Sequence, residues 1–376
     1  MSGSWQTWTS ANSGLPADHV TDVVQDARGD LWLATYGGGL ARCSEAGGDW
    51  QVLRAGPGGP FNDYVGALAL DPAGRLWVVC DARRVEGLDI PGAVSVLAPD
   101  GTWQHHPRPA GEGCLRFLEA GRDGRMWFRM GGTVASDAPT RCLGLREGSD
   151  RYCGGQWLTW DGAAWAEIAE ERAAAAAWYP QRPARTRLGW ALEGERLWLL
   201  ETVAPSLETP EAPPGFSLPL AISANLGVFM NRYQLACFDG RSWGELFELP
   251  SPYRYGELAV DARGDKWVSL VMLGDIVMLH GVARLQGGAG AEAAWTCFDR
   301  GSGLPYDYVG AISADARGGV WCSHLGGDLS RWDGAGWAHL PGGEEGRGKE
   351  PLGRAFEDGQ GRLWFPSRAG VVVGNH

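Results

Sequence analysis

The residues best suited to chemistry belong to a short motif that occurs three times. Each copy joins an aspartate, an aromatic ring and a valine, as Asp18-His19-Val20, Asp63-Tyr64-Val65 and Asp307-Tyr308-Val309. Imidazole and phenol groups donate and accept hydrogen bonds, and carboxylates accept them, so the motif could bind a polar ligand. The aspartates have a structural alternative, because an aspartate in a turn commonly accepts hydrogen bonds from nearby backbone N–H groups.

Other polar and aromatic residues are expected to share the site with this motif. The predicted ligand-binding residues are His19, Tyr36, Asp63, Tyr64, Arg116, Arg129, Tyr255, Asp307, Tyr308 and His324. Arg116 and Arg129 could receive a carboxylate or a phosphate group. The alternative for these two arginines is ion pairing with neighbouring Asp or Glu side chains. No catalytic residue is predicted.

A metal site or a Cys–His nucleophile pair is a further alternative for His19 and His324. The two histidines could meet on one face of the fold, with Cys80, Cys114 or Cys322 nearby. Buried cysteines and hydrogen-bonded histidines explain the same residues. The sequence has no HxH or HExxH pair, no GxSxG and no P-loop. We therefore expect neither a metal nor another cofactor.

Composition and charge narrow the class of partner. The formal net charge is −12 at pH 7, whereas nucleic-acid binding needs a basic surface, so no nucleic-acid partner is expected. The sequence shows neither an apolar run of about 18 residues nor an export signal, which predicts a cytoplasmic protein without a membrane span. The cysteines form no CxxC pair, so free thiols are expected. Cys142 and Cys153 are the pair to test for a disulfide.

A repeated phrase predicts the elements that position these residues. In each copy a turn rich in Asp and Gly joins an apolar run to a run that begins near a tryptophan, which is typical of a β-hairpin. The copies end at Trp32, Trp77, Trp127, Trp198, Trp267, Trp321 and Trp364. A large flat ring fills the space between stacked sheets, so we expect these tryptophans to have a packing role.

The strand count predicts an all-β fold, a seven-bladed β-propeller of four-stranded blades. The last repeat supplies three strands, and the segment around Trp5 and Trp8 supplies one strand with no repeat before it. The N-terminal strand should therefore complete the last blade and close the ring, which removes exposed sheet edges. We expect residues 1–376 to form one domain and the protein to be a monomer.

The run GLPxD(H/Y)V, followed by a DARG turn, a tryptophan and GGxLxR, resembles the two-component-regulator propeller repeat. Residues 14–43 and 303–332 carry the run most fully, residues 60–80 and 257–285 carry it in part, and residues 114–260 diverge. Asp18 and Asp307 stand where that family often has Asn. The resemblance implies a sensory or ligand-binding role by analogy. A stand-alone propeller is expected, because no kinase, receiver or DNA-binding segment follows the repeats in this sequence.

Long loops are expected over one face of the propeller. In a blade with strands a to d from axis to rim, the b–c and d–a loops share a face, and the insertions at 131–155, 171–187 and 202–231 belong to it. Long loops in a compact domain are usually functional. The predicted site residues lie on the same face, so we expect the insertions to cover one mouth of the central channel.

Two functions of different classes follow from this reading. The first is a ligand-binding or interaction propeller that recognises a small molecule, a peptide or a partner protein at the loop-covered mouth. The alternative is a propeller enzyme of the lyase, cyclase or hydrolase type, with acid–base or metal-assisted chemistry at the same mouth. A deep pocket would favour a small ligand or catalysis, and a flat face would favour a protein partner.

Overall fold

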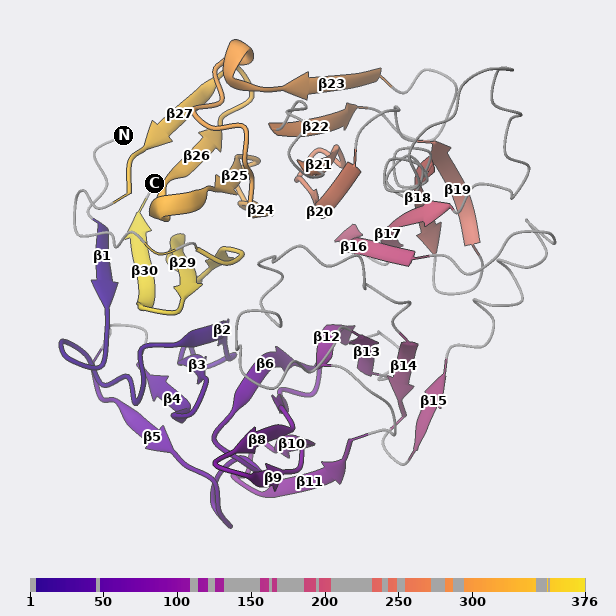
Figure 1. Cartoon of the computed structure of the whole chain (residues 1–376). Helices are drawn as coiled ribbons and strands as arrows, with labels where there is room; N and C mark the ends of the chain where they lie inside the picture. The colour runs from indigo at the N-terminus through magenta and orange to yellow at the C-terminus, as the bar shows by residue number, and fades with distance from the viewer. Residues whose placement is uncertain are drawn as a thin grey trace. The chain divides into compact units, whose positions relative to one another are not determined.

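In the computed structural model of the chain, the regular structure of the described residues is almost entirely antiparallel β-sheet (Figure 1). It describes residues 5–44, 48–108, 114–120, 126–131, 156–161, 164–167, 186–193, 196–203, 232–238, 243–248, 254–271, 281–286, 294–342, 350 and 352–375. Helix in these ranges is limited to two short 3-10 segments, Arg300–Ser302 and Leu325–Gly327. Within the same ranges, no helix has the length and apolar character that a membrane crossing requires.

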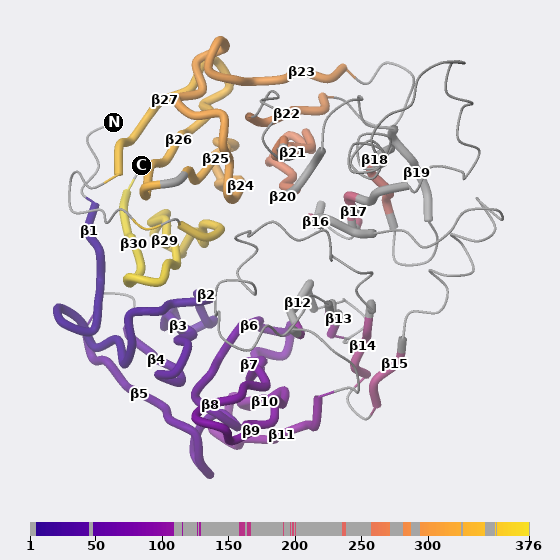
Figure 2. The backbone as a smooth tube through the Cα atoms, in the orientation of Figure 1, coloured from indigo at the N-terminus to yellow at the C-terminus, as the bar shows by residue number. Residues whose placement is uncertain are grey.

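The described strands form seven four-stranded sheets. The first sheet contains β2 (Val20–Gln25), β3 (Leu31–Thr35), β4 (Gly39–Cys43) and β5 (Gln51–Leu53), and the second contains β6 (Val65–Leu70), β7 (Leu76–Cys80), β10 (Ala93–Leu97) and β11 (Trp103–Pro107). The third contains β12 (Cys114–Ala120), β13 (Met126–Gly131), β14 (Gln156–Trp160) and β15 (Trp165–Glu167). The fourth contains β16 (Thr186–Glu193), β17 (Arg196–Val203), β18 (Arg232–Phe238) and β19 (Trp243–Glu248). The next two are β20 (Arg254–Val260), β21 (Lys266–Val271), β22 (Gly281–Gln286), β23 (Ala294–Phe298); and β24 (Ala311–Ala314), β25 (Val320–Ser323), β26 (Leu329–Trp332), β27 (Trp337–Leu340). A small hairpin of β8 (Arg83–Val85) and β9 (Leu88–Ile90) lies between β7 and β10 in the sequence, where Figure 2 traces it.

The last sheet joins the two ends of the chain. It contains β28 (Phe356–Glu357), β29 (Arg362–Ser367), β30 (Gly370–Asn375) and the N-terminal strand β1 (Trp5–Trp8). Strand β1 pairs antiparallel with β30 from Trp5 opposite Gly374 to Trp8 opposite Val371, and Figure 1 shows the indigo strand beside the yellow one. The N-terminal strand therefore completes the last sheet, in the pairing that the sequence predicts.

The chain divides into two compact units. The first unit, Met1–Glu167 with Ser313–His376, packs its sheets in succession through shared apolar clusters. Phe365 of β29 packs with Trp321 of β25, and Trp364 of the same strand packs with Leu33 of β3. In the second unit, Ile168–Ile312, Leu200 of β17 packs with Val268 of β21. In each unit the cores therefore lie between neighbouring sheets.

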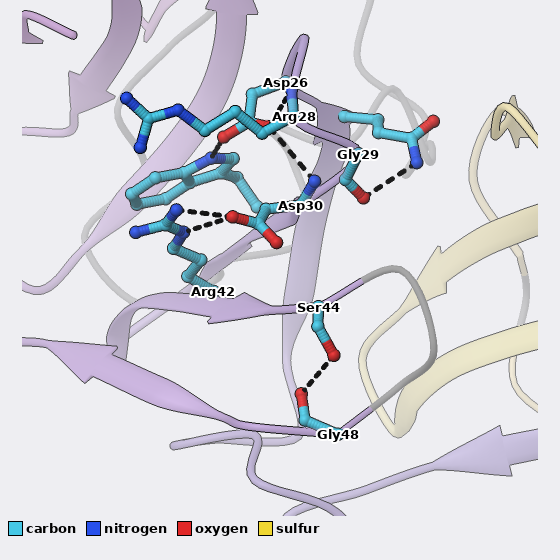
Figure 3. Close-up of polar contacts among 9 residues, drawn as sticks. Asp26, Arg28, Gly29, Asp30, Arg42, Ser44 and Gly48 are labelled. Carbon is cyan, nitrogen blue, oxygen red and sulfur yellow. Dashed lines mark hydrogen bonds and ion pairs between the residues drawn. The ribbon is translucent and has the colours of Figure 1, made fainter.

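The repeated phrase forms a turn in which one carboxylate makes three hydrogen bonds. Asp26 Oδ1 accepts from the backbone N–H groups of Arg28 and Asp30 at 2.9 and 3.0 Å, and Asp26 Oδ2 accepts from Trp32 Nε1 at 3.0 Å (Figure 3). Gly29 has φ 89°, a left-handed conformation that favours glycine. Asp26 thus fixes both the turn between β2 and β3 and the indole that follows it.

The same bond from indole to carboxylate recurs along the chain. It joins Trp77 to Asp71, Trp267 to Asp261, Trp321 to Asp315 and Trp364 to Asp358, with distances of 2.8 to 2.9 Å. The tryptophans that end the phrase are buried, with exposed fractions of 0 to 5% at positions 32, 77, 198, 267, 321 and 364. The packing role predicted for them is confirmed; the side chain of the seventh, Trp127, lies outside the described set.

An arginine lies over the indole in five of these sheets, and it comes from one of two places. In two sheets it is the fourth residue after the aspartate of the turn, as Arg75 and Arg362, and the residue opposite the tryptophan is Val96 or Val373. In three sheets it is the residue opposite the tryptophan, as Arg42, Arg284 and Arg331. Each guanidinium also contacts an aspartate of its own turn. One cation therefore covers each ring, whichever strand supplies it.

Candidate functional site

The aspartates of the Asp-aromatic-Val motif hold the loops that precede their strands. Asp18 Oδ1 accepts from the backbone N–H of Ser10 at 2.7 Å, Asp63 Oδ1 from that of Ala55 at 2.7 Å, and Asp307 Oδ1 from that of Arg300 at 2.9 Å. The bond from Ser10 lowers the pKa of the Asp18 carboxyl below its ordinary value. This geometry agrees with the structural alternative for the aspartates, with donors seven or eight residues upstream.

The aromatic members of two motif copies meet in a row in the first unit. The ring centre of Tyr36 lies 5.3 Å from that of His19 and 5.3 Å from that of Tyr64. The backbone aligns the rings. The backbone N–H of Tyr36 donates to the carbonyl of His19 at 2.9 Å, and the backbones of Tyr36 and Tyr64 form an isolated antiparallel β-bridge. Bonds between the first two sheets fix their spacing, as Thr21 Oγ1 donates to the carbonyl of Val65 at 2.8 Å.

Arg83, from the β8–β9 hairpin, adds a cation to this row. Its guanidinium carbon lies 5.1 Å from the ring centre of Tyr36 and 5.2 Å from that of Tyr64, so it contacts both π systems. Its neighbour Arg84 points to a different environment, with a side chain that is 67% exposed and 3.7 Å from Asp89. Arg83 is half-buried.

Arg368, in the turn between β29 and β30, is the second cation of the cluster. It follows β29 directly, as Tyr36 follows β3, and the sheets of these two strands pack together through Trp364 and Leu33. Both Arg83 and Arg368 act electrostatically on the His19 ring. We call His19, Tyr36, Tyr64, Arg83 and Arg368 the His-Tyr-Arg cluster.

The cluster contains buried polar atoms without a protein partner. In the described part of the chain, no acceptor lies within hydrogen-bond distance of Arg83 Nε, Arg368 Nε or Arg368 Nη2, and His19 Nε2 is also unpartnered. A buried polar group left without a partner costs about 1–3 kcal/mol, and more when it is charged. Such groups are rare in folded proteins, so each of these atoms needs an explanation, such as an ordered water molecule, an ion or a ligand.

The electrostatics of the cluster follow from burial and from the two arginines. Burial first, then Arg368 and Arg83, lower the pKa of His19 to about 4. The imidazole is therefore neutral near pH 7, where it offers one donor and one acceptor. The cluster as a whole carries positive charge, although the chain has a formal net charge of −12.

Among the other predicted site residues, His324 belongs to the core of a sheet. His324 is buried at 2% exposure, and its Nε2 lies 2.6 Å from Ser330 Oγ inside its own sheet. Asp307 and Tyr308 belong to the second unit. Arg116 and Arg129 are register partners in β12 and β13, and Tyr255 is the partner of Leu270, but the side chains of these three predicted residues lie outside the described set.

Sequence reasoning missed Arg83 and Arg368. The signal for Arg368 was present, because it directly follows the second strand of its sheet, the position that identified Tyr36 and His324. Arg83 lies in a hairpin without a counterpart in the other described sheets, so no repeat position pointed to it. Insertions were predicted at 131–155, 171–187 and 202–231 to cover the mouth. Of these, residues 132–155, 171–185 and 204–231 lie outside the described residues, as do Cys142 and Cys153.

Cys80 and Cys322 are buried thiols. Burial raises the pKa of the Cys80 and Cys322 thiols, and a protonated, buried thiol is a poor nucleophile. Cys80 Sγ lies 3.7 Å from Ser95 Oγ, inside the second sheet. Across the described ranges, no group of three or more His, Cys, Asp or Glu side chains could hold a metal ion.

Comparisons with known proteins identify the fold and one repeat. The family model of the two component regulator propeller matches residues 14–37. Comparison with curated proteins finds no match. Similar solved structures include a streptogramin B lyase (12% identity, 99% of this chain, 97% of that chain, TM-score 0.58). A second is YCF48 bound to D1 peptide (11% identity, 99% of this chain, 94% of that chain, TM-score 0.58). A third is the β-propeller domain of Cps50 (Swd1) from Myceliophteria thermophila (12% identity, 98% of each chain, TM-score 0.55). At these identities the likeness shows the β-propeller fold alone.

Proposed function

Because residues 14–37 are a two component regulator propeller repeat on a β-propeller fold, we propose that this protein is a ligand-binding propeller whose site is the His-Tyr-Arg cluster. The carrying observation is that His19, Arg83 and Arg368 each have buried nitrogen atoms without a protein partner in the described part of the chain. Arg83 lies over the rings of Tyr36 and Tyr64, and the charges of Arg83 and Arg368 both act on His19. Aromatic rings and fixed polar groups together are typical of sites that bind small molecules or peptide side chains.

The proposed architecture is a ring of seven blades with the site at one mouth of its channel. It is supported by the seven four-stranded sheets, by the β1–β30 pairing, and by similar propellers of which 94 to 98% is covered. We further propose a cytoplasmic monomer. The free thiols of Cys43, Cys80, Cys237, Cys297 and Cys322 are compatible with a reducing compartment.

Binding is favoured over catalysis by the protonation state of His19. A general acid or base works best when its pKa lies near the operating pH. The pKa of His19 is about 4, so its ring stays neutral near pH 7. A solved relative described as YCF48 bound to D1 peptide illustrates that a propeller can serve as a binding scaffold.

A binding screen with two neighbouring arginine variants tests this function. A library of carboxylates, phosphates, neutral sugars and short peptides is screened by thermal shift against the wild-type protein, Arg83→Gln and the control Arg84→Gln. Arg84 is exposed, so its variant should behave as wild type. We expect at least one library member to stabilise wild type and Arg84→Gln but not Arg83→Gln. A screen in which every binder stabilises all three proteins equally would place the site elsewhere.

A further inference from the structure

We infer that the ligand of the His-Tyr-Arg cluster carries an oxyanion, a carboxylate or a phosphate, which binds to the Nε–Nη2 edge of Arg368. This inference rests on the proposed function and names the chemical class of its ligand. Its starting point is the pair of buried nitrogen atoms on one edge of the Arg368 guanidinium, neither of which has a protein partner in the described part of the chain.

The shape of that edge selects its partner. The N–H groups on Nε and Nη2 lie in the guanidinium plane and point the same way, so they match two oxygen atoms of one planar or tetrahedral anion. A neutral carbonyl offers one oxygen and no charge. A water molecule can accept from the fork but leaves the charge of the guanidinium uncompensated.

The protein itself shows what this edge binds elsewhere. Arg42, Arg284 and Arg331 each donate from both Nε and Nη2 to one carboxylate oxygen, Oδ2 of Asp30, Asp265 and Asp315 respectively. Arg75 and Arg362 donate from Nε to Asp71 and Asp358 at 2.6 Å. In all five cases Nε contacts a carboxylate. Arg368 keeps the same edge buried with its acceptor missing, as a site for a ligand carboxylate or phosphate would.

The surroundings of Arg368 favour a negative charge. The positive charges of both Arg368 and Arg83 act on His19, which is itself neutral. Arg83 is held against the faces of Tyr36 and Tyr64, and its Nε is also buried without an acceptor. Two cations near one imidazole repel each other, and an anion between them would remove that repulsion. His19 Nε2 is a further group that could donate to the anion in the matching tautomer.

The test measures binding of inorganic phosphate and of acetate at constant ionic strength, by titration of the thermal unfolding midpoint. The proteins are wild type, Arg368→Gln, Arg368→Lys and the control Arg28→Gln, whose side chain is exposed in a turn of the first sheet. We expect one or both anions to stabilise wild type and Arg28→Gln, and the dissociation constant to rise at least about tenfold in Arg368→Gln. Arg368→Lys keeps the charge but loses the fork, so it should also bind more weakly than wild type.

The pattern of results separates the two anions and the two proposals. Stabilisation by phosphate alone or by acetate alone identifies which oxyanion the site takes, and either supports the inference. Equal responses of wild type and Arg368→Gln to both anions would overturn it. The proposed function would survive that result if a neutral library member still bound in a manner that depends on Arg83. Should Arg368→Gln fold poorly, the comparison of Arg368→Lys with wild type decides the same question.

Discussion

The guanidinium carbon of Arg83 lies 5.1 Å from the ring centre of Tyr36, a contact between a side chain of the β8–β9 hairpin and the residue that follows β3. The contact orients the hairpin arginine over the first sheet. Its neighbour Arg84 instead lies 3.7 Å from Asp89. The positions of the Tyr36 and Tyr64 rings thus determine where the guanidinium of Arg83 lies.

Removing the Tyr36 ring should weaken both the fold near the site and anion binding. A cation–π contact is worth about 0.5–2 kcal/mol, so Tyr36→Leu should lower the free energy of unfolding by about 1 kcal/mol. It should also raise the dissociation constant for phosphate several-fold. Tyr36→Phe keeps the π face and should remain close to wild type in chemical unfolding. Equal losses in both variants would mean that the hydroxyl, not the ring face, matters.

His19 should make the protein less stable as the pH falls below neutral. Its pKa in the folded state is about 4, below the ordinary value of 6.5, so the unfolded chain binds more protons between these two values. The free energy of unfolding contributed by His19 is therefore complete above pH 6.5 and is lost as the pH falls toward 4. Wild type and His19→Gln should differ in the slope of stability against pH across this window.

The arginines provide a second check on the same histidine. Arg368 and Arg83 lower the pKa of His19 in addition to burial. Proton NMR titration of the His19 ring should therefore give a higher pKa in Arg368→Gln and in Arg83→Gln than in wild type. An unchanged pKa in both variants would show that the cations lie too far from the ring to act on it.

The Asp71 carboxylate should stabilise the second sheet most strongly at neutral pH. Burial alone would raise the pKa of Asp71, but hydrogen bonds from Trp77 and Arg75 outweigh it and hold that pKa below its ordinary value of 3.8. The contribution of Asp71 to the free energy of unfolding is thus fully present above the unfolded-state pKa, and it is lost as the pH falls through the lower folded-state pKa. Asp71→Asn should cost about 1–3 kcal/mol at pH 7, measured by urea unfolding, and less in acid.

The arginine over the tryptophan comes either from the fourth position after the aspartate of the turn or from the position opposite the tryptophan, and the two positions should be interchangeable. The first sheet has Asp30 in the turn and Arg42 opposite Trp32, whereas the second has Arg75 in the turn and Val96 opposite Trp77. Asp30→Arg and Arg42→Val should each destabilise the protein, and the double variant should recover much of the loss. The expected coupling energy is about 0.5–3 kcal/mol. Additive losses would show that the cation has no fixed role over the ring.

Much of the fold could be predicted because its local chemistry repeats. The Asp and Trp of the phrase bond to each other within six residues, so the hairpin is visible in the sequence itself. The pairing of β1 with β30 follows because the last repeat has only three strands and the N-terminal strand has no repeat before it. The closure of the ring and the number of blades remain predictions, as do the loops over its mouth.

The site was less predictable, because only some of its members have the residue type that the repeat favours. His19, Tyr36 and Tyr64 were predicted as ligand-binding residues, and the structure places their rings together. Asp63 binds a loop backbone, and His324 is buried against Ser330, because short-range partners were available to both. Arg83 lies in an inserted hairpin and has no repeat position. Arg368 shares the position of Tyr36 and His324 but differs from them in residue type, so its position alone pointed to it.

The most direct test is the nitrogen–proton NMR spectrum of the arginine Nε–H groups during a titration with inorganic phosphate. Arg368→Lys and Arg83→Lys assign the two signals, and Arg28 serves as the exposed reference. We predict that the Arg368 signal, and with it that of Arg83, moves to a saturating value while the Arg28 signal stays in place. Signals of Arg368 and Arg83 that do not move, or that move no more than the Arg28 signal, would contradict an oxyanion site in the His-Tyr-Arg cluster.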